Sequence, residues 1–351
     1  MTSEYKIKQI KKDFLVEEIF LSPDFCSPEK AEFTYLWIKK EGITTFEALD
    51  KIKNILKLNS EDVAAQGLKD EDAITQQLIS VKEIIFDREL KKINKKFNSN
   101  KQKLEIQSIK GYGTSSLKPR LLHGNKFKLI IRNLNKNSAK YFYDYCQSNR
   151  FMTFINYYDN QRFGISGGPY NTHLIGKGII EGNYREVLKQ LKKSKDVEFK
   201  NIKEKILKDG FLKKMLEEIN FLKLKFFISS YNSYLWNKSV SEYLLKDKNN
   251  KNYYFPNIGN LFLPKKDLFI LPNIFSVNSY DINEDYKIFK TTTSRNLSVT
   301  TTVFPFDIKR DELNKNKYCL RVDFLLPTGC YATMLIRQIF IKLNNYSCRE
   351  K

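Results

Sequence analysis

A short acidic segment, Asp70–Glu71–Asp72, offers the clearest chemistry in the sequence. An apolar run that begins at Val63 ends at Gly67, and an alternating run from Ile74 to Val81 follows the acidic residues. This pattern predicts two strands joined by a tight connection. A carboxylate on such a connection is held by two rigid elements while its oxygens stay open to a ligand, as a catalytic acid or nucleophile requires. A solvated acidic turn is the alternative interpretation of the same residues.

A second unusual segment runs from Phe154 to Gly164 and combines amides, aromatic rings and one guanidinium. Amides can bind the edge of a nucleobase, aromatic rings can stack on its face, and arginine can bind phosphate. A segment of aromatic core with a single surface Arg162 would give the same pattern. Gly164, Gly167 and Gly168 are expected to turn the chain after it.

The composition indicates a globular, strongly basic protein. The chain has 351 residues, of which 41% are hydrophobic, enough for two domains with cores of their own. Lys and Arg outnumber Asp and Glu by 61 to 40, a formal net charge of +21. Such a surplus attracts polyanions, with nucleic acid first and an anionic membrane surface second. A lysine- and asparagine-rich proteome would produce the same charge without such a partner.

The cysteines and the N-terminus bear on location. The five cysteines form no C-x-x-C pair, and only His123 and His173 accompany them, so the spacing of a zinc site is lacking. A dispersed, odd set of cysteines is typical of reduced thiols. Residues 1–6 lack the apolar core of a signal peptide, and no apolar run reaches the length of a membrane span. We therefore expect a cytoplasmic protein without metal and without membrane attachment.

Hydrophobic periodicity predicts strands and helices around these two segments. Strand patterns lie at residues 14–20, 33–38, 127–131 and 318–326, and helix patterns at 44–58, 138–147 and 332–341. The lysine-dense stretch Lys91–Lys103 is expected to be a solvated connection or an RNA-facing loop, and Gly111–Thr114 a turn. From about residue 181 to 305 helical patterns dominate, interrupted by loops such as Lys246–Asn252. This change predicts a separate module inserted into a β-rich one.

Seven stretches, in one order from residue 13 to residue 337, resemble blocks of the TruD-type tRNA pseudouridine synthases. Gly67–Asp70 with Ala73–Gln77 is similar to the family signature G-x-K-D-x-x-A-x-T-x-Q. The other stretches are Asp13–Glu18, Gly42–Leu49, Gly124–Phe127, Asn156–Gly164, Ser229–Asn237, and Leu326–Thr333 followed by Arg337. Each stretch alone is a weak signal, but the ordered set is specific.

The resemblance implies an α+β fold and a particular reaction. A mixed, largely antiparallel sheet flanked by helices would form a discontinuous pseudouridine synthase domain, residues 1–180 and 306–351. An inserted α/β TRUD domain would occupy residues 181–305, with an RNA cleft between the two domains. The implied reaction converts a uridine of tRNA, at position 13 in the D arm for family members, to pseudouridine without a metal or organic cofactor. Nothing in the sequence demands a protein partner or more than a monomer.

The resemblance also assigns roles to residues. Asp70 matches the catalytic aspartate, which would act as nucleophile or as base beside C1′ and C2′ of the ribose. The target base must leave the stack to be reached. The substrate-contacting positions of the family fall on Phe14, Asn156 and Tyr331, two stacking or walling rings and one amide.

Three residues depart from the family pattern. Tyr158 stands in place of the usual Phe, and its phenol could stack on the base or transfer a proton at C5. Asp159 stands in place of Gly, and Glu71 in place of a basic residue, where it would add negative charge near Asp70. Arg337 and Arg162 are both candidates for the cation that balances Asp70.

Two other functions fit parts of the sequence. A non-catalytic tRNA-binding or RNA-chaperone protein on the same fold would not need the carboxylate of Asp70. A two-carboxylate hydrolase that uses Asp70 and Asp72 is a further possibility.

Overall fold

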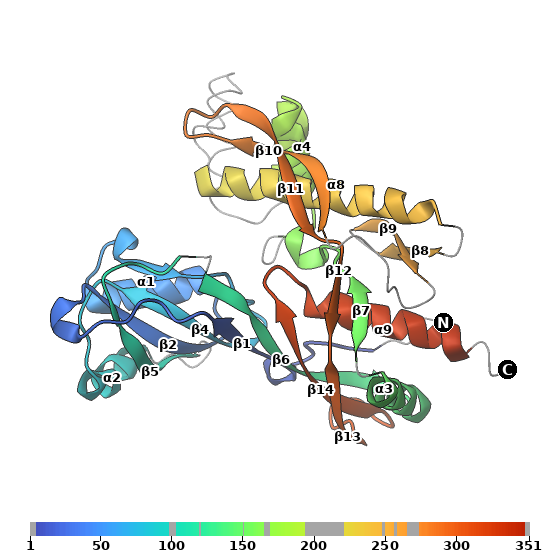
Figure 1. Ribbon diagram of the computed structural model, residues 1–351, viewed down its shortest axis with the longest axis horizontal. Coiled ribbons are helices and arrows are strands. Elements are labelled where there is room, and N and C mark those ends of the chain that lie inside the picture. Colours follow the sequence, from blue (N-terminus) through green and yellow to red (C-terminus); the bar gives the residue numbers. More distant parts are fainter. Residues whose placement is uncertain are drawn as a thin grey trace. The chain divides into compact units, whose positions relative to one another are not determined.

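The computed structural model describes residues 5–97, 103–118, 121–149, 151–164, 169–193, 221–247, 250–255, 258–264 and 274–347. The chain divides into two compact units (Figure 1). The first unit comprises residues 1–152 and 301–332, and the second comprises residues 153–300 and 333–351. Residues 181–300 of the expected inserted domain lie in the second unit; the domain boundaries at 180 and 305 stay a prediction.

The first unit is built on an eight-stranded sheet with the order β13-β14-β6-β1-β4-β2-β5, in which β3 pairs with β4. Strand β1 runs parallel to β4, whereas the pairs β1–β6, β6–β14, β13–β14, β2–β4, β2–β5 and β3–β4 are antiparallel. The sheet is therefore mixed and largely antiparallel, as the resemblance implied. Its strands are β1 (Phe14–Phe20), β2 (Phe33–Glu41), β3 (Val63–Ala65), β4 (Ile74–Val81), β5 (Lys103–Gly113), β6 (Leu122–Leu134), β13 (Val303–Arg310) and β14 (Tyr318–Pro327).

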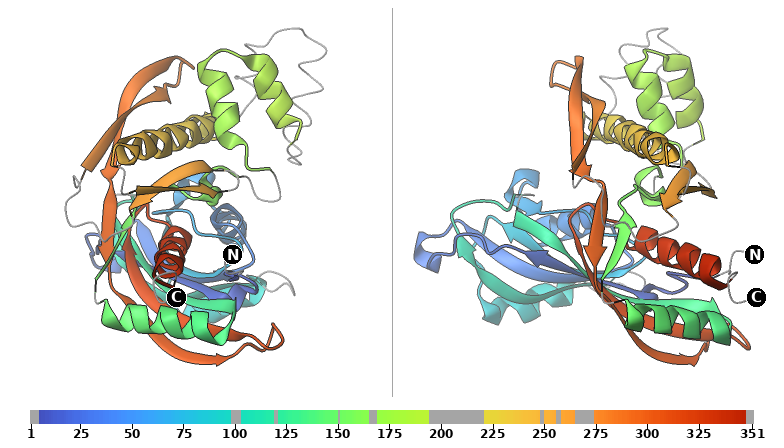
Figure 2. Two further views of the ribbon diagram at one scale, coloured as in Figure 1. Left: turned by 90° about the vertical axis from the view of Figure 1, so that its right-hand side faces the viewer. Right: turned by 45° about the vertical axis from the view of Figure 1, so that its right-hand side comes forward.

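Two helices of the first unit cover one face of this sheet. Helix α1 (Thr45–Leu56) begins with the predicted capping box, in which Thr44 accepts a hydrogen bond from the Glu47 amide and the Glu47 carboxylate accepts one from the Thr44 amide. Helix α2 (Asp87–Asn94) packs with α1, β2, β4 and β5 in one apolar core. Helix α3 (Lys136–Ser148) lies along β13 and β14 (Figure 2).

Two local expectations are wrong, for identifiable physical reasons. The stretch after Lys91 is not simply a connection, because Leu90, Ile93 and Phe97 recur at helical spacing and are buried against the sheet. Helix α2 and a 3-10 turn (Lys95–Phe97) occupy it up to residue 97, while residues 98–102 lie outside the described residues. The expected turn at Gly111–Thr114 belongs to strand β5 as far as Gly113, where a Cβ atom would collide with the Tyr35 hydroxyl. A glycine there permits close packing and does not reverse the chain.

The second unit is centred on the long helix α8 (Phe221–Leu245). Helices α4 (Thr172–Ile180) and α5 (Tyr184–Leu191) share an apolar core with α8 and with the hairpin of β10 (Ile274–Ile282) and β11 (Ile288–Asn296) (Figure 1). The other elements are β7 (Met152–Ile155), β8 (Asn250–Phe255), β9 (Gly259–Pro264), β12 (Ser298–Thr301) and α9 (Ala332–Ser347). Between residues 250 and 305 the described residues are thus mostly strands, whereas the sequence pattern favoured helices across residues 181–305. None of the described helices is long and apolar enough to cross a membrane.

Candidate active site

Asp70 lies on the segment between strands β3 and β4, as predicted. The two strands pair antiparallel, with Val63 opposite Val81 and Ala65 opposite Ile79. Residues 66–73, here called the elbow, connect them. The Asp70 side chain is 31% exposed, so its carboxylate is reachable from solvent while its backbone is attached to the sheet on both sides.

A lysine from the N-terminal segment contacts the Asp70 carboxylate. The ammonium of Lys8 lies 2.7 Å from Oδ2 of Asp70 and 4.2 Å from the centre of the Phe14 ring. Lys8 was not among the cations that the sequence suggested, because no spacing rule joins residues 62 positions apart. The only local signal was the basic run that leads into β1.

The backbone of the elbow is held by buried polar side chains. The amide of Lys69 donates to Oγ1 of Thr45, at 2.9 Å, and the Gln77 side chain donates to the carbonyl of Gly67. The ammonium of Lys40 on β2 donates to the carbonyls of Lys69 and Asp70, at 3.1 and 2.9 Å. Burial lowers the pKa of Lys40 to about 8, although the charge of Asp70 acts to raise it. The residue that carries the carboxylate is therefore fixed on several sides.

A buried ion pair ties the elbow to the first strand. The ammonium of Lys69 lies 2.6 Å from Oε1 of Glu18 on β1, and the side chains of both are almost fully buried. The second oxygen of Glu18 accepts a hydrogen bond from the Leu78 amide of β4. The lysine and aspartate of the G-x-K-D pattern thus have different tasks, since Lys69 faces the interior and Asp70 faces outward.

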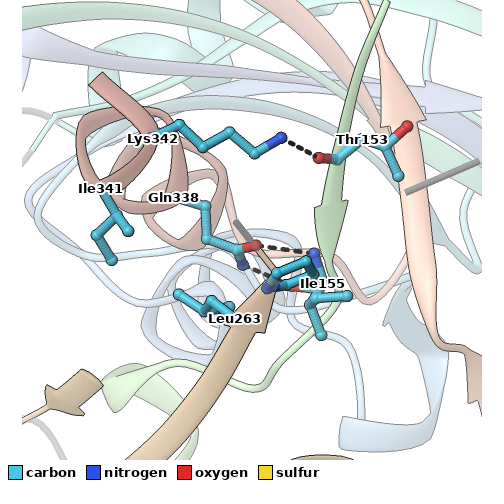
Figure 3. A pocket seen from close by; sticks show the side chains of 7 residues that line it. Thr153, Ile155, Leu263, Gln338, Ile341 and Lys342 are labelled. Atoms are coloured by element: carbon cyan, nitrogen blue, oxygen red, sulfur yellow. Dashed lines mark hydrogen bonds between the residues drawn. The ribbon is translucent and has the colours of Figure 1, made fainter. Parts of the chain in front are cut away.

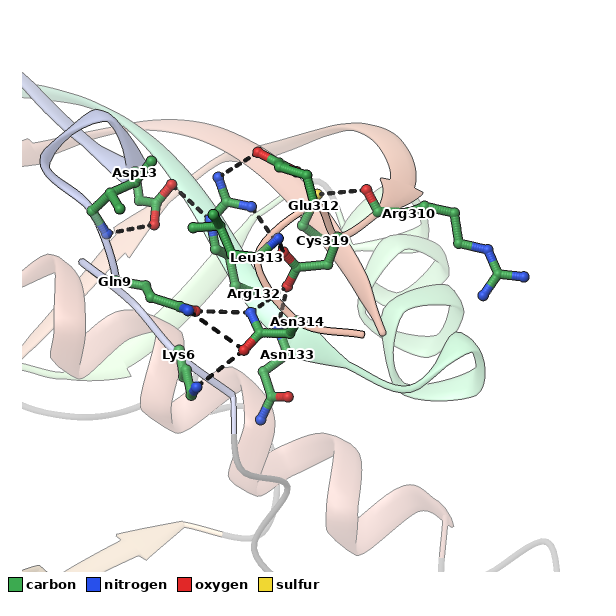
Figure 4. Close-up of polar contacts among 12 residues, drawn as sticks. Lys6, Gln9, Asp13, Arg132, Asn133, Arg310, Glu312, Leu313, Asn314 and Cys319 are labelled. Atoms are coloured by element: carbon green, nitrogen blue, oxygen red, sulfur yellow. Dashed lines mark hydrogen bonds and ion pairs between the residues drawn. The ribbon is translucent and has the colours of Figure 1, made fainter. Parts of the chain in front are cut away.

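The N-terminal segment that carries Lys8 is anchored by a buried arginine (Figure 4). The Arg132 guanidinium on β6 donates to Asp13 at 2.8 Å, to Asp311 at 2.9 Å and to Glu312 at 3.0 Å. The backbone of Lys6 pairs with that of Arg132 in both directions. Burial alone would lower the pKa of Arg132, but the hydrogen bonds that it donates to its carboxylate partners outweigh burial and raise the pKa. Lys8 consequently lies between Lys6 and Asp13, both of which are bound to Arg132.

Phe14 and Tyr331, like Asp70, belong to the first unit. Phe14 is only 2% exposed and packs edge-on against Phe127, while the Lys8 ammonium lies over its ring. Tyr331 is partly buried and follows Gly329, whose φ of 82° allows the turn between β14 and α9.

Asn156 and Tyr158 belong to the second unit. Asn156 is 4% exposed and its side-chain amide donates to the carbonyl of Asn296. Its Oδ1 atom has no hydrogen-bond donor among the described residues. The Tyr158 ring packs face-on against the Arg295 guanidinium at 3.9 Å and edge-on against Trp236. Both side chains are thus oriented by contacts inside their own unit.

Helix α8 holds the polar-aromatic segment in place. The Asn237 side chain accepts from the Tyr158 amide and donates to the Tyr158 carbonyl, each at 2.9 Å. Ser233 and Ser229 accept hydrogen bonds from the Arg162 guanidinium. The stretch Ser229–Asn237, which resembled a family block, therefore acts as a support for residues 156–163.

The two arginines considered as partners of Asp70 make their recorded contacts within the second unit. Arg337 on α9 forms an ion pair with Asp159 at 3.3 Å, and Asp159 also accepts from the Thr333 hydroxyl. The carboxylate that departs from the family pattern is thus part of a buried network. Gly164 ends this segment, and the predicted turn at Gly167 and Gly168 lies outside the described residues.

Helix α9 also fixes the strand that leads into Asn156 (Figure 3). The Gln338 side chain donates to the Ile155 carbonyl at 2.7 Å and accepts from the Ile155 amide at 2.9 Å. Lys342 donates to the carbonyl of Thr153. These side chains line a small hollow beside β9, and their polar groups bind the strand.

The first unit therefore presents a carboxylate that is fixed in position, paired with a cation and open to solvent. Such a group can act as a nucleophile or as a base. Within the described ranges, no group of three or more His, Cys, Asp or Glu side chains could hold a metal ion.

Comparison with known proteins identifies the family. Residues 3–221 match the family model described as tRNA pseudouridine synthase D (TruD). The chain is 26% identical to the probable tRNA pseudouridine synthase D 1 of Methanococcus maripaludis, over 95% of this chain and 99% of that protein. It is 25% identical to the tRNA pseudouridine synthase D of Leptospira interrogans, over 96% of both chains.

A solved structure shares the fold. The crystal structure of the putative tRNA pseudouridine synthase D of Methanosarcina mazei superposes with a TM-score of 0.57 and 17% identity, over 97% of this chain and 94% of that one. The resemblance seen in the motifs and the expected fold class are both confirmed. This chain belongs to the TruD family of tRNA pseudouridine synthases.

Proposed function

We propose that this protein isomerises a uridine of tRNA to pseudouridine, with Asp70 as the catalytic residue. The observation that carries the proposal is the carboxylate of Asp70, 31% exposed on a braced elbow and 2.7 Å from the ammonium of Lys8. The pairing orients the carboxylate, and the exposure leaves it accessible to a ribose. By analogy with the family, the substrate uridine is position 13 in the D arm.

The reaction balances without any further reactant. The bond between C1′ and N1 breaks, the uracil rotates, and a bond forms between C1′ and C5. The proton on C5 leaves and N1 gains a proton. The product is an isomer of the substrate, so no oxidant or reductant is needed. Asp70 serves either as a nucleophile that attacks C1′ or as a base that removes a proton from C2′.

Four side chains contact the flipped-out uridine in this proposal. Phe14 and Tyr331 form walls around the base, and the burial of Phe14 supports a walling role over open stacking. Asn156 offers Oδ1, an acceptor without a donor among the described residues, to an N–H of the uracil. Tyr158 stacks on the base or on a neighbouring one.

The charge of the protein supports an RNA partner. A formal net charge of +21 attracts the phosphate backbone, which supplies much of the affinity in protein–RNA complexes. We propose that the protein works in the cytoplasm as a monomer, without an obligate protein partner and without a metal or cofactor. A non-catalytic tRNA-binding protein is the competing function.

The test compares the wild-type protein with Asp70→Asn and, as a matched control, Asp72→Asn on the same elbow. Each is incubated with a transcribed tRNA, and pseudouridine is mapped by its carbodiimide adduct. We expect wild type and Asp72→Asn to be active, and Asp70→Asn to lose at least about 1,000-fold in rate while it still binds tRNA. A wild-type protein that binds tRNA and forms no pseudouridine would favour the binding function. Loss of activity in Asp72→Asn as well would favour a pair of carboxylates.

The position of the target is tested separately with a tRNA whose uridine 13 is replaced by cytidine. We expect this substrate to bind and to remain unmodified. Pseudouridine elsewhere in that tRNA would refute the position and leave the reaction itself intact.

A further inference from the structure

A buried lysine donates hydrogen bonds to the backbone of the elbow at Asp70 and at the residue before it. Lys40 lies on strand β2 and is only 1% exposed. Its ammonium donates hydrogen bonds to three backbone carbonyls, those of Ile43 at 2.8 Å, Lys69 at 3.1 Å and Asp70 at 2.9 Å. One charged group therefore joins the turn before α1 to the two central residues of the elbow.

The three acceptors match the chemistry of a protonated lysine. An ammonium has three N–H donors, whereas a neutral amine has only two and a lone pair that would face a carbonyl oxygen. Burying a charge is costly unless each of its donors has a partner. All three acceptors are bound only when Lys40 is charged, and a methionine in its place would remove this donor from each of the three carbonyls.

We propose that Lys40 is a positioning residue for catalysis. Its ammonium fixes the main chain of Lys69 and Asp70, and so sets the direction in which the Asp70 carboxylate leaves the elbow. This inference rests on the proposed function of Asp70. Lys40 does not reach the substrate in this role, since its three donors are all engaged with the backbone.

The surroundings of Lys40 make this positioning dependent on pH. Burial is the main cause that lowers the pKa of Lys40 to about 8, and the nearby charge of Lys69 lowers it further. The carboxylates of Asp70, Glu71 and Glu47 act in the opposite direction. As pH rises above about 8, Lys40 loses a proton and one carbonyl loses its donor. The rate of pseudouridine formation should therefore fall in the same range.

Two variants of Lys40 and one neighbour test the proposal. Lys40→Met removes all three donors, and Lys40→Arg keeps the charge at every accessible pH. Lys39→Met is the matched control, because Lys39 is the next residue on β2 and its side chain lines a separate hollow with Glu17 and Gln76. Single-turnover rate, tRNA affinity and thermal unfolding are measured for each variant.

We expect Lys40→Met to lose at least about 30-fold in single-turnover rate while its tRNA affinity stays within about two-fold of wild type. Lys39→Met should keep the wild-type rate. Folded Lys40→Met with the wild-type rate, or with weakened tRNA binding and an unchanged rate, would overturn the proposal.

The pH profile decides the matter even if Lys40→Met does not fold. The wild-type rate should decline above about pH 8, and Lys40→Arg should have a lower rate that does not decline there. The same decline in both proteins, or none in wild type, refutes the role of Lys40.

Asp70→Asn separates this inference from the proposed function. If Asp70→Asn keeps the wild-type rate, the proposed function is wrong and the role of Lys40 falls with it. If Asp70→Asn is inactive while Lys40→Met is fully active, only the role of Lys40 is wrong.

Discussion

The ammonium of Lys8 lies 2.7 Å from Oδ2 of Asp70, although 62 residues separate the two in the chain. Lys8 has a left-handed backbone with a φ of 60°, between the Lys6–Arg132 backbone pair and the Ile10 amide, which donates to Asp13. The cation is thus held by the chain on both sides of it. Phe14, over whose ring the ammonium lies, restricts it further.

Replacement of Lys8 by methionine should slow pseudouridine formation. The Asp70 carboxylate would lose a charge-assisted hydrogen bond of about 1.5–3 kcal/mol, which corresponds to about 10- to 150-fold in rate if the bond is kept in the transition state. The measurement is the single-turnover rate on tRNA. Lys8→Arg should recover part of the loss, since it keeps the charge.

Lys12→Met is the control for this experiment, because Lys12 is an exposed lysine of the same segment. It removes one positive charge in the same way and should leave the rate within about two-fold of wild type. If both Lys8→Met and Lys12→Met slow the reaction equally, the lysines act through their general attraction of RNA, and the ion pair of Lys8 with Asp70 has no specific role.

Replacement of Arg132 by methionine should destabilise the protein strongly. The side chains of Asp13 and Asp311 are fully buried against the guanidinium, so the variant would leave two carboxylates without their cation. Breaking a buried ion pair in this way costs about 3–5 kcal/mol. Urea unfolding followed by circular dichroism measures the loss. A change below about 1 kcal/mol would show that water or other donors replace the arginine.

Acid should weaken the same cluster. Burial alone would raise the pKa of Asp311, but hydrogen bonds, from the Asn133 amide first, outweigh it and lower that pKa. A carboxylate whose pKa is lowered by folding stabilises the protein above its unfolded pKa of about 3.9, and this contribution is lost as pH falls through the folded value. We expect the free energy of unfolding to fall below about pH 4, and to fall less in Asp311→Asn.

The elements near the site could be predicted because their signals are local. Thr44 and Glu47 form a capping box within four residues, and the alternation from Ile74 to Val81 defines a strand whatever lies beside it. Asp70 could be found because its neighbours carry a motif.

The two lysines that hold Asp70 and its backbone could not be found in this way. Lys8 and Lys40 look like ordinary lysines in a chain with 61 basic residues, and only the pairing of distant strands brings them to the elbow.

The same limit applies to the second unit. The stretch Ser229–Asn237 could be recognised as a block, but its pattern did not reveal that it supports residues 156–163 through Asn237 and the serines. Arg337 was a candidate for the cation that balances Asp70, because an arginine within a family motif could take that role. Its recorded ion pair is with Asp159.

Asn237 and Asn232 on α8 provide a matched pair for testing that support. Asn237 binds the backbone amide and carbonyl of Tyr158, and Asn232 binds those of Tyr280 in the same manner. Alanine at either position leaves partly buried backbone groups without partners, at about 1–3 kcal/mol. Both variants should therefore lower the unfolding midpoint to a similar extent.

Only one of the two variants should affect catalysis. Asn237→Ala loosens the segment that carries Asn156 and Tyr158, so its single-turnover rate should fall by about 10-fold or more, measured below its unfolding temperature. Asn232→Ala should keep the wild-type rate. Equal rates in the two variants would assign Asn237 to stability alone.

Tyr158 distinguishes stacking from proton transfer. Phenylalanine would keep the ring contacts with the Arg295 guanidinium at 3.9 Å, the Arg162 guanidinium at 5.9 Å and Trp236 at 5.8 Å. If the ring stacks on RNA, Tyr158→Phe should keep the rate within about two-fold, and Tyr158→Ala should lose the stacking, about 1–3 kcal/mol. Release of tritium from C5 of labelled uridine measures the step directly.

If the phenol takes the C5 proton, Tyr158→Phe will instead lose as much of the rate as Tyr158→Ala. Tyr254→Phe, at a tyrosine exposed on β8, controls for loss of a hydroxyl elsewhere.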